Sequence, residues 1–535
     1  MSFMADDLIQ VTEDSARSGF FLFSGTALAT IIMAVATIFI GRLLGPELYG
    51  QYSLSFVIPQ ILFLATDFGI TTGIARYTAS FKAKGESSRI ERLVKHALLL
   101  RALVAAILFA INYFLADVLA SLLLQRPDLA FFMRIASTSI LFQAVFTTTT
   151  SAFVGLDKSQ YHALVTNVQA LAKTLISLLL VIVGLGVAGA VMGFTASYLV
   201  GAITGVALLY LMLHRGKESN VTIDVSHDLK ALIHYGAPLY LSILLSGLIP
   251  FYQNVVLSNF TTYTEIGNYK AAANFYILIA VLSVSITTAL VPAFSKIGST
   301  TVQKARRFFK LANKYATLII VPSALIVIIY SGDIVGTVYG STFQQAPLFL
   351  SSYCLIYFLA GLGSITLGSF YNGLGETKTT LAISLSTFIP LLVLSPLLTR
   401  AFKVQGLITG FLISSALGTA CAVYKATQKF KLDFDTSSLT KIYIASTASC
   451  IPSLTISVFA QLPRITVFSE QVSIPVNLIV GALLYLGVYV TLLPAMKIIT
   501  HSDLQAIEKV SQTIPLLKLI IRPLVRYEQR ILRAE

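Results

Sequence analysis

Long apolar stretches of about twenty residues recur along the whole chain and alternate with short polar segments. A stretch of this length can cross the hydrocarbon core of a bilayer as a helix. Because lipid offers no partner for an open sheet edge, we expect every span to be helical. Prolines within the spans predict kinks, at Pro59, Pro238, Pro250, Pro322 and Pro390. The pattern predicts about fourteen spans, near residues 19–40, 51–75, 97–121, 131–153, 162–184, 187–212, 231–256, 271–293, 312–331, 347–369, 379–399, 404–424, 440–460 and 472–496.

The composition supports this interpretation and excludes soluble classes of protein. Of the 535 residues, 56% are hydrophobic and only 12% are charged, about half the charged fraction of a soluble protein. A cytosolic enzyme, a secreted scaffold and a disordered chain are therefore excluded. The three cysteines, Cys354, Cys421 and Cys450, lie inside apolar segments, which indicates buried small side chains without a disulfide framework.

The formal net charge of +14 does not indicate nucleic-acid binding, because the basic residues lie at the ends of the apolar spans, where they set the membrane topology. Basic residues gather in every second connection between spans, which places 31 of the 38 Lys and Arg on the side of the N-terminus. Cytoplasmic connections carry such an excess, so both termini are expected in the cytoplasm. The tail from Ser502 mixes apolar and basic residues and predicts an amphipathic helix on the anionic inner leaflet.

Short segments recur at a nearly constant offset, which indicates an internal repeat. Residues 49–52 (YGQY) recur as 266–269 (IGNY), 70–72 (ITT) as 286–288 (ITT), and 154–156 (VGL) as 372–374 (NGL), at offsets of 217, 216 and 218. Six spans per repeat is an even number, so both halves have one orientation and are related by a pseudo-two-fold axis along the membrane normal. Pairs of bundles of this kind are typical of transporters whose lobes rock about a central cavity.

The predicted fold is therefore an all-α integral membrane protein with two six-helix lobes in a parallel pseudo-two-fold repeat and two added C-terminal helices. The expected segments are a cytoplasmic N-terminus (1–18), an N-lobe (19–213), a cytoplasmic linker (214–230), a C-lobe (231–425), spans thirteen and fourteen (438–497) and the amphipathic tail (502–535).

One segment resembles a known family signature. Residues 41–52 (GRLLGPELYGQY) resemble the RxLGPexYGxYsl pattern of polysaccharide-type flippases, which export oligosaccharide or O-antigen repeat units. These flippases belong to the multidrug/oligosaccharidyl-lipid/polysaccharide exporter superfamily. Residues 67–69 (DFG) and the pair Gly155–Leu156 also look like that family, and the resemblance extends from about residue 15 to 495. It implies movement of an undecaprenyl- or dolichol-type lipid-linked oligosaccharide from the cytoplasmic to the outer leaflet.

Cations within or near the spans are candidate ligands for a lipid phosphate. Arg42 matches the arginine of an A-R-x-x-G pattern in the related lipid II flippases, with Gly41 in place of the alanine, and the resemblance implies that it is needed for function. Arg42 and Lys270 lie near outer span ends, where snorkelling to the interface is the alternative role. Arg76 lies at the cytoplasmic end of span two, where it either binds the incoming phosphate or serves as a basic residue that sets the topology. Lys173 lies midway along span five and is expected to line the cavity.

Other polar residues within the spans suit a glycan. Asp67 is the only acid deep in the first lobe, and it either pairs with Lys173 or Arg76 or takes part in ion coupling. Gln253 and Asn254 follow Pro250 in span seven, and Asn274 is similarly placed in span eight. Contact with sugar hydroxyls and hydrogen bonding between helices are equally good interpretations of these three amides.

Several apparent enzyme motifs lack the surroundings that they need. Residues 433–435 (DFD) form the D-x-D pattern of sugar-nucleotide enzymes, but they stand in a short connection without a catalytic domain. The six histidines lie at cytoplasmic span ends without metal-ligand spacing, so no metal site is expected. No P-loop sequence is present, so the chain itself is not expected to hydrolyse ATP. No cofactor is expected, and coupling to Na⁺ or H⁺ is left open.

Three functions remain to be compared. The first is a flippase for lipid-linked oligosaccharide or polysaccharide repeat units that works by alternating access in the plasma membrane as a monomer. Its partners would be the bilayer and a polyprenyl-(pyro)phosphate-linked glycan, with no nucleic acid. A cation-coupled multidrug antiporter is the alternative, although span one holds no acid for the coupling ion. A membrane glycosyltransferase is the third, and the short, acid-poor outer connections disfavour it.

Overall fold

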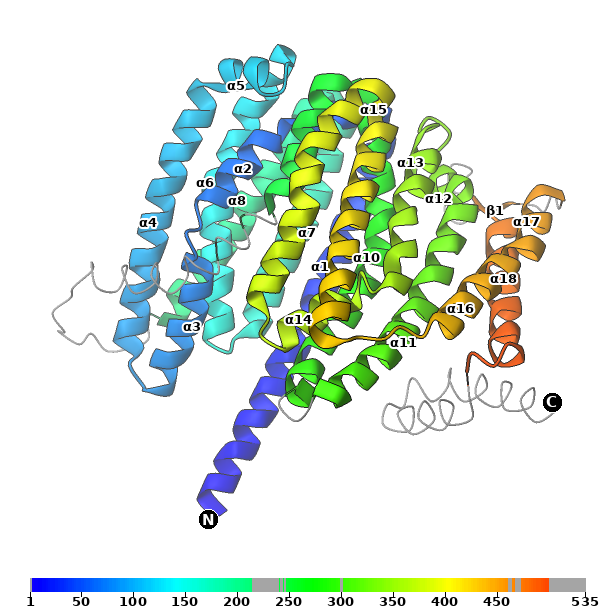
Figure 1. Ribbon diagram of the computed structural model, residues 1–535. Coiled ribbons are helices and arrows are strands. Elements are labelled where there is room, and N and C mark those ends of the chain that lie inside the picture. The colour runs from blue at the N-terminus through cyan, green and yellow to red at the C-terminus, as the bar shows by residue number, and fades with distance from the viewer. Residues whose placement is uncertain are drawn as a thin grey trace. The chain divides into compact units, whose positions relative to one another are not determined.

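The computed structural model describes residues 2–213, 240, 244, 247–298, 302–459, 464–466 and 473–499 of the 535-residue chain (Figure 1). For residues 2–20 it describes the main chain alone. The predicted cytoplasmic linker (214–230), the amphipathic tail (502–535) and Pro238 lie outside the described residues.

The chain divides into two compact units, Met1–Lys270 and Ala271–Glu535, and the division falls inside helix α10. The first unit is helical throughout its described part, and residues 247–260 form a further helix before α10. Its elements are α1 (Ser2–Ser55), α2 (Val57–Ala65), α3 (Ile70–Ala83), α4 (Ser87–Phe114), α5 (Ala116–Leu122), the 3₁₀ turn η1 (Pro127–Leu129), α6 (Ala130–Gly155), α7 (Ser159–Leu180), the π-helical turn η2 (Val181–Leu185), α8 (Gly186–Leu213) and the start of α10 (Tyr263–Gly298).

The second unit contains the rest of α10 and the C-terminal helices. A two-stranded antiparallel ribbon, with Ile465 opposite Ile474, is its one departure from helix among the described elements. The elements are α11 (Val302–Ile329), α12 (Ser331–Tyr339), α13 (Ala346–Cys354), the 3₁₀ helix η3 (Leu355–Leu362), α14 (Thr366–Gly373), α15 (Thr377–Phe430), α16 (Thr436–Ala448), α17 (Cys450–Phe459), β1 (Arg464–Thr466), β2 (Ser473–Pro475) and α18 (Val476–Ala495).

Eight helical segments of the described chain are long and apolar enough to cross a membrane, or nine when the bent pair Ala346–Leu362 and Thr366–Gly373 is included. Two of the eight, Ser159–Leu213 and Thr377–Phe430, have 55 and 54 residues. At 1.5 Å per residue each would measure about 80 Å, more than twice the hydrocarbon thickness. Each segment must therefore contain more than one span. The all-α fold in repeated halves is confirmed, and the count of fourteen spans stays a prediction.

Both long segments fold back on themselves as helical hairpins. In the first, the chain turns at Gly184 and Gly186, which have φ of 98° and 51°, and Gly193 then packs against Ser177. In α15 the chain turns at Phe402 and Lys403. Figure 1 shows the two arms of α15 side by side in yellow.

The glycines between the hairpin arms allow close backbone approach. A Cβ on Gly406 would lie 2.0 Å from the carbonyl oxygen of Leu398, and one on Gly418 would lie 1.9 Å from Oγ1 of Thr387. The two hairpin turns are 217 to 218 residues apart, which is the offset of the sequence repeat.

A second contact repeats at the same offset. A Cβ on Gly155 would lie 2.4 Å from the carbonyl oxygen of Ala75, and one on Gly373 would lie 2.8 Å from that of Val291. Gly155 and Gly373 are 218 residues apart, and Ala75 and Val291 are 216 apart. Spans two and four thus meet as spans eight and ten do, so the structure bears out the internal repeat.

The two repeats also contact one another within the first unit, and this contact is reciprocal. A Cβ on Gly50 would lie 2.1 Å from the carbonyl oxygen of Tyr263, and a Cβ on Gly267 would lie 1.8 Å from that of Pro46. Gly50 corresponds to Gly267, and Pro46 to Tyr263, at an offset of 217. The contact of Gly50 with Tyr263 is therefore the same as the contact of Gly267 with Pro46, with the two repeats exchanged. A two-fold axis produces pairs of equivalent contacts of this kind. We refer to it as the glycine crossing.

Two predicted spans are interrupted at residues with positive φ, and a glycine lies at each of these two breaks. Span two breaks between α2 and α3, where Phe68 and Gly69 have φ of 43° and 80°. Span ten unwinds into η3 and bends by 50° at Gly363, which has φ of 86°. By contrast α11 and α15 continue through Pro322 and Pro390, where the sequence predicts kinks. Neighbouring helices tolerate an intramembrane proline when they satisfy the freed carbonyl.

We predict that Gly50→Ala and Gly267→Ala destabilise the protein to a similar degree, because each added methyl group would meet a rigid carbonyl across the glycine crossing. The expected cost is about 1–3 kcal/mol each, typical of overpacking. Thermal melting of the solubilised chain would measure it. Gly336→Ala is the control, since no atom lies within 4 Å of the added group. Melting temperatures for all three variants equal to that of the parent chain would contradict the proposed packing.

Candidate functional site

The break in span two gathers several polar contacts in the first unit. Helix α2 ends at Ala65, and α3 starts at Ile70 after two residues in the left-handed region, Phe68 and Gly69. A non-glycine residue at positive φ is strained and persists only where its surroundings hold it. Strain of this kind gathers at functional sites, which makes this break a candidate site.

Asp67 lies within the break and closes the start of α3. Its Oδ1 accepts a hydrogen bond from the backbone N–H of Thr71 at 3.1 Å, and its Oδ2 accepts one from the Thr71 hydroxyl at 2.8 Å. The start of a helix carries unpaired N–H groups and a partial positive charge, so a carboxylate is stabilised there. The Asp67 side chain is 15% exposed.

Arg101 of α4 forms an ion pair with this carboxylate. Its Nη1 lies 3.4 Å from Oδ1 of Asp67 and donates a hydrogen bond to the hydroxyl of Thr148 on α6 at 3.3 Å. The Arg101 side chain is only 2% exposed, and its Cζ lies 5.8 Å from the centre of the Phe63 ring. Its Nε is buried without a hydrogen-bond partner in the described part of the chain. Since a guanidinium has five N–H donors, this group retains capacity to bind a further anion.

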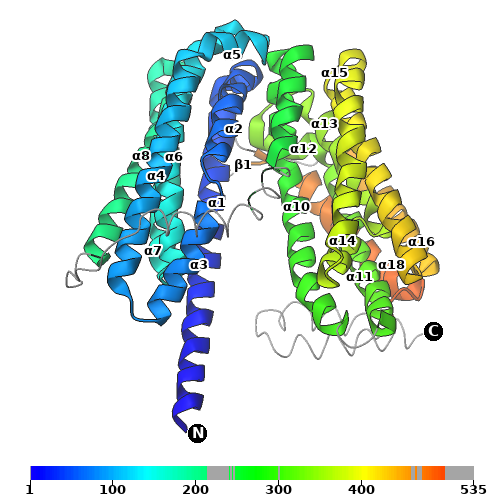
Figure 2. The same cartoon turned by 60° about the vertical axis from the view of Figure 1, so that its left-hand side comes forward.

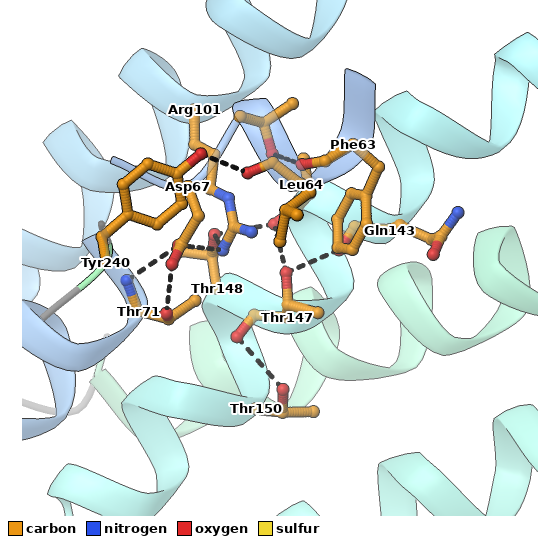
Figure 3. A network of polar contacts seen from close by, with 12 residues as sticks. Phe63, Leu64, Asp67, Thr71, Arg101, Gln143, Thr147, Thr148, Thr150 and Tyr240 are labelled. Carbon is orange, nitrogen blue, oxygen red and sulfur yellow. Dashed lines mark hydrogen bonds and ion pairs between the residues drawn. The ribbon is translucent and has the colours of Figure 1, made fainter. Parts of the chain in front are cut away.

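Tyr240 brings span seven into the same cluster. Its hydroxyl donates a hydrogen bond to the carbonyl oxygen of Leu64 at 2.8 Å, and its ring lies 6.2 Å from that of Phe68. The Leu64 carbonyl at the end of α2 also accepts a longer backbone hydrogen bond from the N–H of Asp67 at 3.4 Å, so Tyr240 provides a second, shorter one. Figure 3 shows the Tyr240 ring beside Asp67 and Arg101. The cluster therefore joins four elements of the first unit.

A row of polar side chains on α6 continues from this cluster. Gln143 accepts a hydrogen bond from Gln60 of α2 at 3.3 Å and donates one to Ser139 at 3.0 Å. Thr147 and Thr148 follow on the same helix, and each donates its hydroxyl proton to a carbonyl of its own helix at 2.7 Å (Figure 3). The Thr148 oxygen also accepts the hydrogen bond from Arg101. The oxygen of half-buried Thr147 keeps lone pairs that can accept further hydrogen bonds in the middle of a predicted span.

From the sequence, Arg101 is not a candidate, and Asp67 has two expected roles, a pair with Lys173 or Arg76 or a part in ion coupling. The structure shows a different partner for Asp67, Arg101. Helix α4 already starts at Ser87, so Arg101 lies in the middle of a 28-residue helix. The position of Arg101 five residues inside the predicted third span, after three leucines, is the signal that could have identified it. A lone acid in one span requires a cation in a neighbouring span, and Arg101 supplies it.

Lys173 and Arg76 lie in different surroundings. Lys173 of α7 is 8% exposed, with its Nζ 3.4 Å from the Thr37 hydroxyl and 5.6 Å from the centre of the Phe194 ring. No ion pair of Lys173 is found within the described residues. Arg76 is exposed on α3, more than two turns beyond Asp67. The structure therefore separates these cations from the Asp67–Arg101 pair.

Arg42 and Lys270 are both half-buried, Arg42 on α1 shortly before the bend at Gly45 and Lys270 on α10. At an offset of 217 their counterparts are Asn259 and Ser53, so they do not hold equivalent positions in the repeat. Arg42, Lys270 and the other sequence-predicted site residues stay candidates.

The three candidate amides differ in their environments. Gln253 and Asn254 are 5% and 8% exposed in the helix of residues 247–260. Nε2 of Gln253 is buried without a hydrogen-bond partner among the described residues. Asn274, in the second unit, donates a hydrogen bond from Nδ2 to the hydroxyl of Tyr339 at 2.7 Å. This last contact is a hydrogen bond between α10 and α12, one of the two roles expected for it.

The D-x-D motif has a structural explanation. Asp435 caps α16, accepting hydrogen bonds from the backbone N–H of Ser438 at 3.2 Å and from its hydroxyl at 2.9 Å. Asp433 pairs with Lys310 at 3.2 Å on the protein surface. Both carboxylates thus stabilise the connection between α15 and α16.

A family model described as "Polysaccharide biosynthesis protein" matches residues 15–298, slightly more than half of the chain. No curated protein matches the sequence. The fold nevertheless has well-matched relatives among solved structures.

The structure is similar to a lipid II flippase, MurJ, in an inward closed conformation, with a TM-score of 0.67 at 15% identity over 88% of this chain and 99% of that one. It is also similar to an inward-facing multidrug resistance MATE family transporter of the MOP superfamily, with a TM-score of 0.63 at 16% identity over 77% of this chain and 96% of that one. A MOP superfamily transporter from Pyrococcus furiosus matches with a TM-score of 0.52 at 17% identity, over 78% and 95%. The chain therefore has the MOP fold.

We predict that Asp67→Ala destabilises the protein by about 3–5 kcal/mol, because it leaves the guanidinium of Arg101 buried and unpaired. The double variant Asp67→Ala/Arg101→Leu should recover most of this loss. Thermal melting of the solubilised chain compares the variants. As a control, Lys310→Ala breaks a pair whose side chains are 40% and 83% exposed, and exposed pairs contribute at most about 1 kcal/mol. Additive effects of the two changes would show that Asp67 and Arg101 are not coupled.

Proposed function

The chain belongs to the polysaccharide biosynthesis protein family, and from this premise we propose that it is a flippase. Its substrate would be an oligosaccharide or polysaccharide repeat unit linked to a polyprenyl phosphate or pyrophosphate. The chain would move this unit from the cytoplasmic to the outer leaflet of the plasma membrane by alternating access. It would act without catalysing a covalent reaction.

The sign of the buried charge is the observation that carries the proposal. Three charged side chains of the described residues are less than 9% exposed, and all three are cations, Arg101, Lys173 and Lys314. Asp67, at 15% exposed, compensates Arg101, and Asp435 interacts electrostatically with Lys314. Charged groups within spans are costly and mark substrate pathways. Lys173 has no ion pair among the described residues, and a buried cation of this kind favours a phosphate over a cationic drug.

The physical task is to carry sugar hydroxyls through hydrocarbon. Each hydroxyl without a partner costs about 2–7 kcal/mol there, so several sugars would cost tens of kcal/mol. The row on α6, with Gln143, Thr147 and Thr148, supplies hydrogen-bonding groups at membrane depth. Cations for the phosphate and hydroxyls or amides for the glycan together remove most of this cost, while the lipid tail stays in the bilayer.

The cation-coupled multidrug antiporter is the less favoured alternative. It needs an acid within the membrane that can bind H⁺ or Na⁺ during the cycle. Asp67 is such an acid, but Arg101, the Thr71 N–H and the Thr71 hydroxyl already neutralise and hydrogen-bond its carboxylate. Release of this carboxylate to a passing ion would leave Arg101 buried and unpaired, which is costly.

Contacts at the end of the first unit that is expected to face outward suit a closed outer gate. The Ser258 hydroxyl donates to the carbonyl of Leu124 at 2.6 Å, and Asn259 donates to that of Leu123 at 3.0 Å. Arg126 donates to the carbonyls of Ser258 and Thr261. By the predicted boundaries these bonds join the N-lobe to the segment that directly follows the first span of the C-lobe. Alternating access requires them to separate when the passage opens outward.

We predict that Arg42→Ala and Lys173→Ala cause lipid-linked glycan to accumulate on the cytoplasmic leaflet, because the phosphate loses a cationic ligand. The measurement is the amount of inward-facing lipid-linked glycan in cells that depend on this chain for export. Lys310→Ala, which removes a cation from a surface ion pair, is the matched control. Normal export by both test variants would refute the assignment of these two cations.

We also predict that a disulfide between cysteines at Leu124 and Ser258 stops export, because it fixes the outer contacts. The three native cysteines would first be replaced by alanine. Export should return when a reductant is added to the same cells. Each single cysteine serves as the control. Undiminished export with the cross-link fully formed would mean that these contacts do not separate during transport.

A further inference from the structure

A cavity lies beside the break in span ten, and none of the candidate site residues described above lines it. It has a volume of about 360 Å³ and lies within the second unit, between α10, η3, α14 and both arms of α15. Figure 2 shows these helices grouped together in that unit. The volume falls within the roughly 300–1,000 Å³ of small-molecule sites.

The lining is polar but uncharged. Seven serine and threonine hydroxyls contribute to it, from Ser283, Ser364, Thr380, Ser384, Thr387, Ser415 and Thr419. None of the described residues that line the cavity carries a charge. A ligand group that fits here is therefore neutral and able to form many hydrogen bonds.

The hydroxyls are already arranged as acceptors. Ser283, Ser384 and Thr387 donate their protons to carbonyls of their own helices, at 3.2, 3.1 and 3.2 Å. The helices thus satisfy these protons in the empty cavity, while the oxygen lone pairs stay available. A ligand that carries O–H donors would complete these hydrogen bonds without leaving buried polar groups unpaired.

Two tyrosines add aromatic surface and a further hydrogen-bonding group. The rings of Tyr276 and Tyr357 stack with centroids 5.4 Å apart, and both residues line the cavity. Tyr357 is 5% exposed, and its hydroxyl makes no hydrogen bond of normal geometry among the described residues. A tyrosine offers an apolar face together with a polar tip, which suits a ligand with both C–H and O–H groups.

The other repeat fills the equivalent space. In the first unit a Cβ on Gly201 would lie 2.8 Å from the Phe146 ring and 3.0 Å from Cβ of Gln169. The counterparts are Gly418 for Gly201, at an offset of 217, and Ser364 for Phe146, at 218. Around Gly418 the three atoms nearest to an added Cβ belong to Thr387 and Ile383. The position that holds the large ring of Phe146 in one repeat therefore holds the small side chain of Ser364, beside a helix break, in the other repeat.

We propose that this cavity binds an uncharged sugar residue of the transported glycan. The hydroxyls of α10 and α15 accept hydrogen bonds from the sugar O–H groups, and Tyr357 supplies a further partner. The cavity would hold one sugar while cations elsewhere hold the phosphate. This assignment rests on the proposed function, because a flippase of lipid-linked glycan is what brings a sugar to this depth.

The first test fills the cavity with the residue of the other repeat. Ser364→Phe should lower export roughly tenfold or more, as expected when a side chain occupies the space of a ligand group. Leu381→Phe adds the same ring on α15 at a position that is 55% exposed and does not line the cavity, so it should export normally. Melting curves of both purified variants confirm that each is folded. Normal export by a folded Ser364→Phe variant would overturn the proposal.

The second test measures binding directly on the full chain in lipid nanodiscs. In a chain whose native cysteines are replaced, a cysteine at Ser415 reports access to the cavity through its rate of maleimide labelling. Methyl glucoside or methyl galactoside should slow labelling severalfold, and Tyr357→Phe should weaken this protection. Glucuronate should protect less, because the cavity offers its charge no partner. Absence of protection by the neutral sugars, or equal protection by glucuronate, would contradict the assignment.

The two tests separate this inference from the proposed function. If the parent chain and the Ser364→Phe variant both export glycan, the flippase proposal stands and the sugar-site proposal is refuted. If the parent chain does not export glycan, the flippase proposal is refuted, and the maleimide-labelling experiment still tests whether the cavity binds a sugar.

Discussion

Hydrocarbon supplies no hydrogen-bond partner to a main chain that leaves its helix, so each break in a span must be closed from within the protein. Asp67 and Tyr240 close the break in span two, at the start of α3 and the end of α2. The break in span ten is closed by Asn313, which donates to the carbonyl of Gly361 at 3.0 Å, and by Tyr443 of α16, which donates to the carbonyl of Phe358. The breaks therefore gather polar side chains at membrane depth, where a transporter of sugars and phosphate needs them.

The repeat shows which of these features are specialised. Its two halves share the contacts of Gly155 and Gly373, the hairpins and the glycine crossing, so these belong to the common framework. The breaks do not repeat: α6, the counterpart of span ten, is continuous, and so is α10, the counterpart of span two. One half thus carries a buried ion pair and the other an uncharged cavity. Duplication followed by divergence explains how one framework can provide two such different polar environments.

Much of the fold could be predicted from the sequence, because apolar length and the repeat offset are properties of the chain itself. The helix breaks could not, since Pro322 and Pro390 lie in continuous helices while Gly363 ends one. Asp67 was identified from its depth in an apolar span, but its partner Arg101 was not, because pairing depends on which helices pack together. The cavity of span ten was missed for the same reason. Its serines and threonines are ordinary in sequence and become notable only where Ser364 replaces the ring of Phe146.

The central claim is that this one chain, without ATP hydrolysis, carries saccharide headgroups across the bilayer through a positively charged interior. Its most direct test is a leaflet-exchange assay in which the purified chain is reconstituted into liposomes with a fluorescent polyprenyl-pyrophosphate oligosaccharide. The labelled glycan should reach the opposite leaflet only in vesicles that contain the chain. An inside-negative potential should change the rate, since each full charge that moves through 100 mV contributes about 2.3 kcal/mol. Glycan that stays in its original leaflet, in vesicles where the same chain accumulates a cationic dye, would contradict the account.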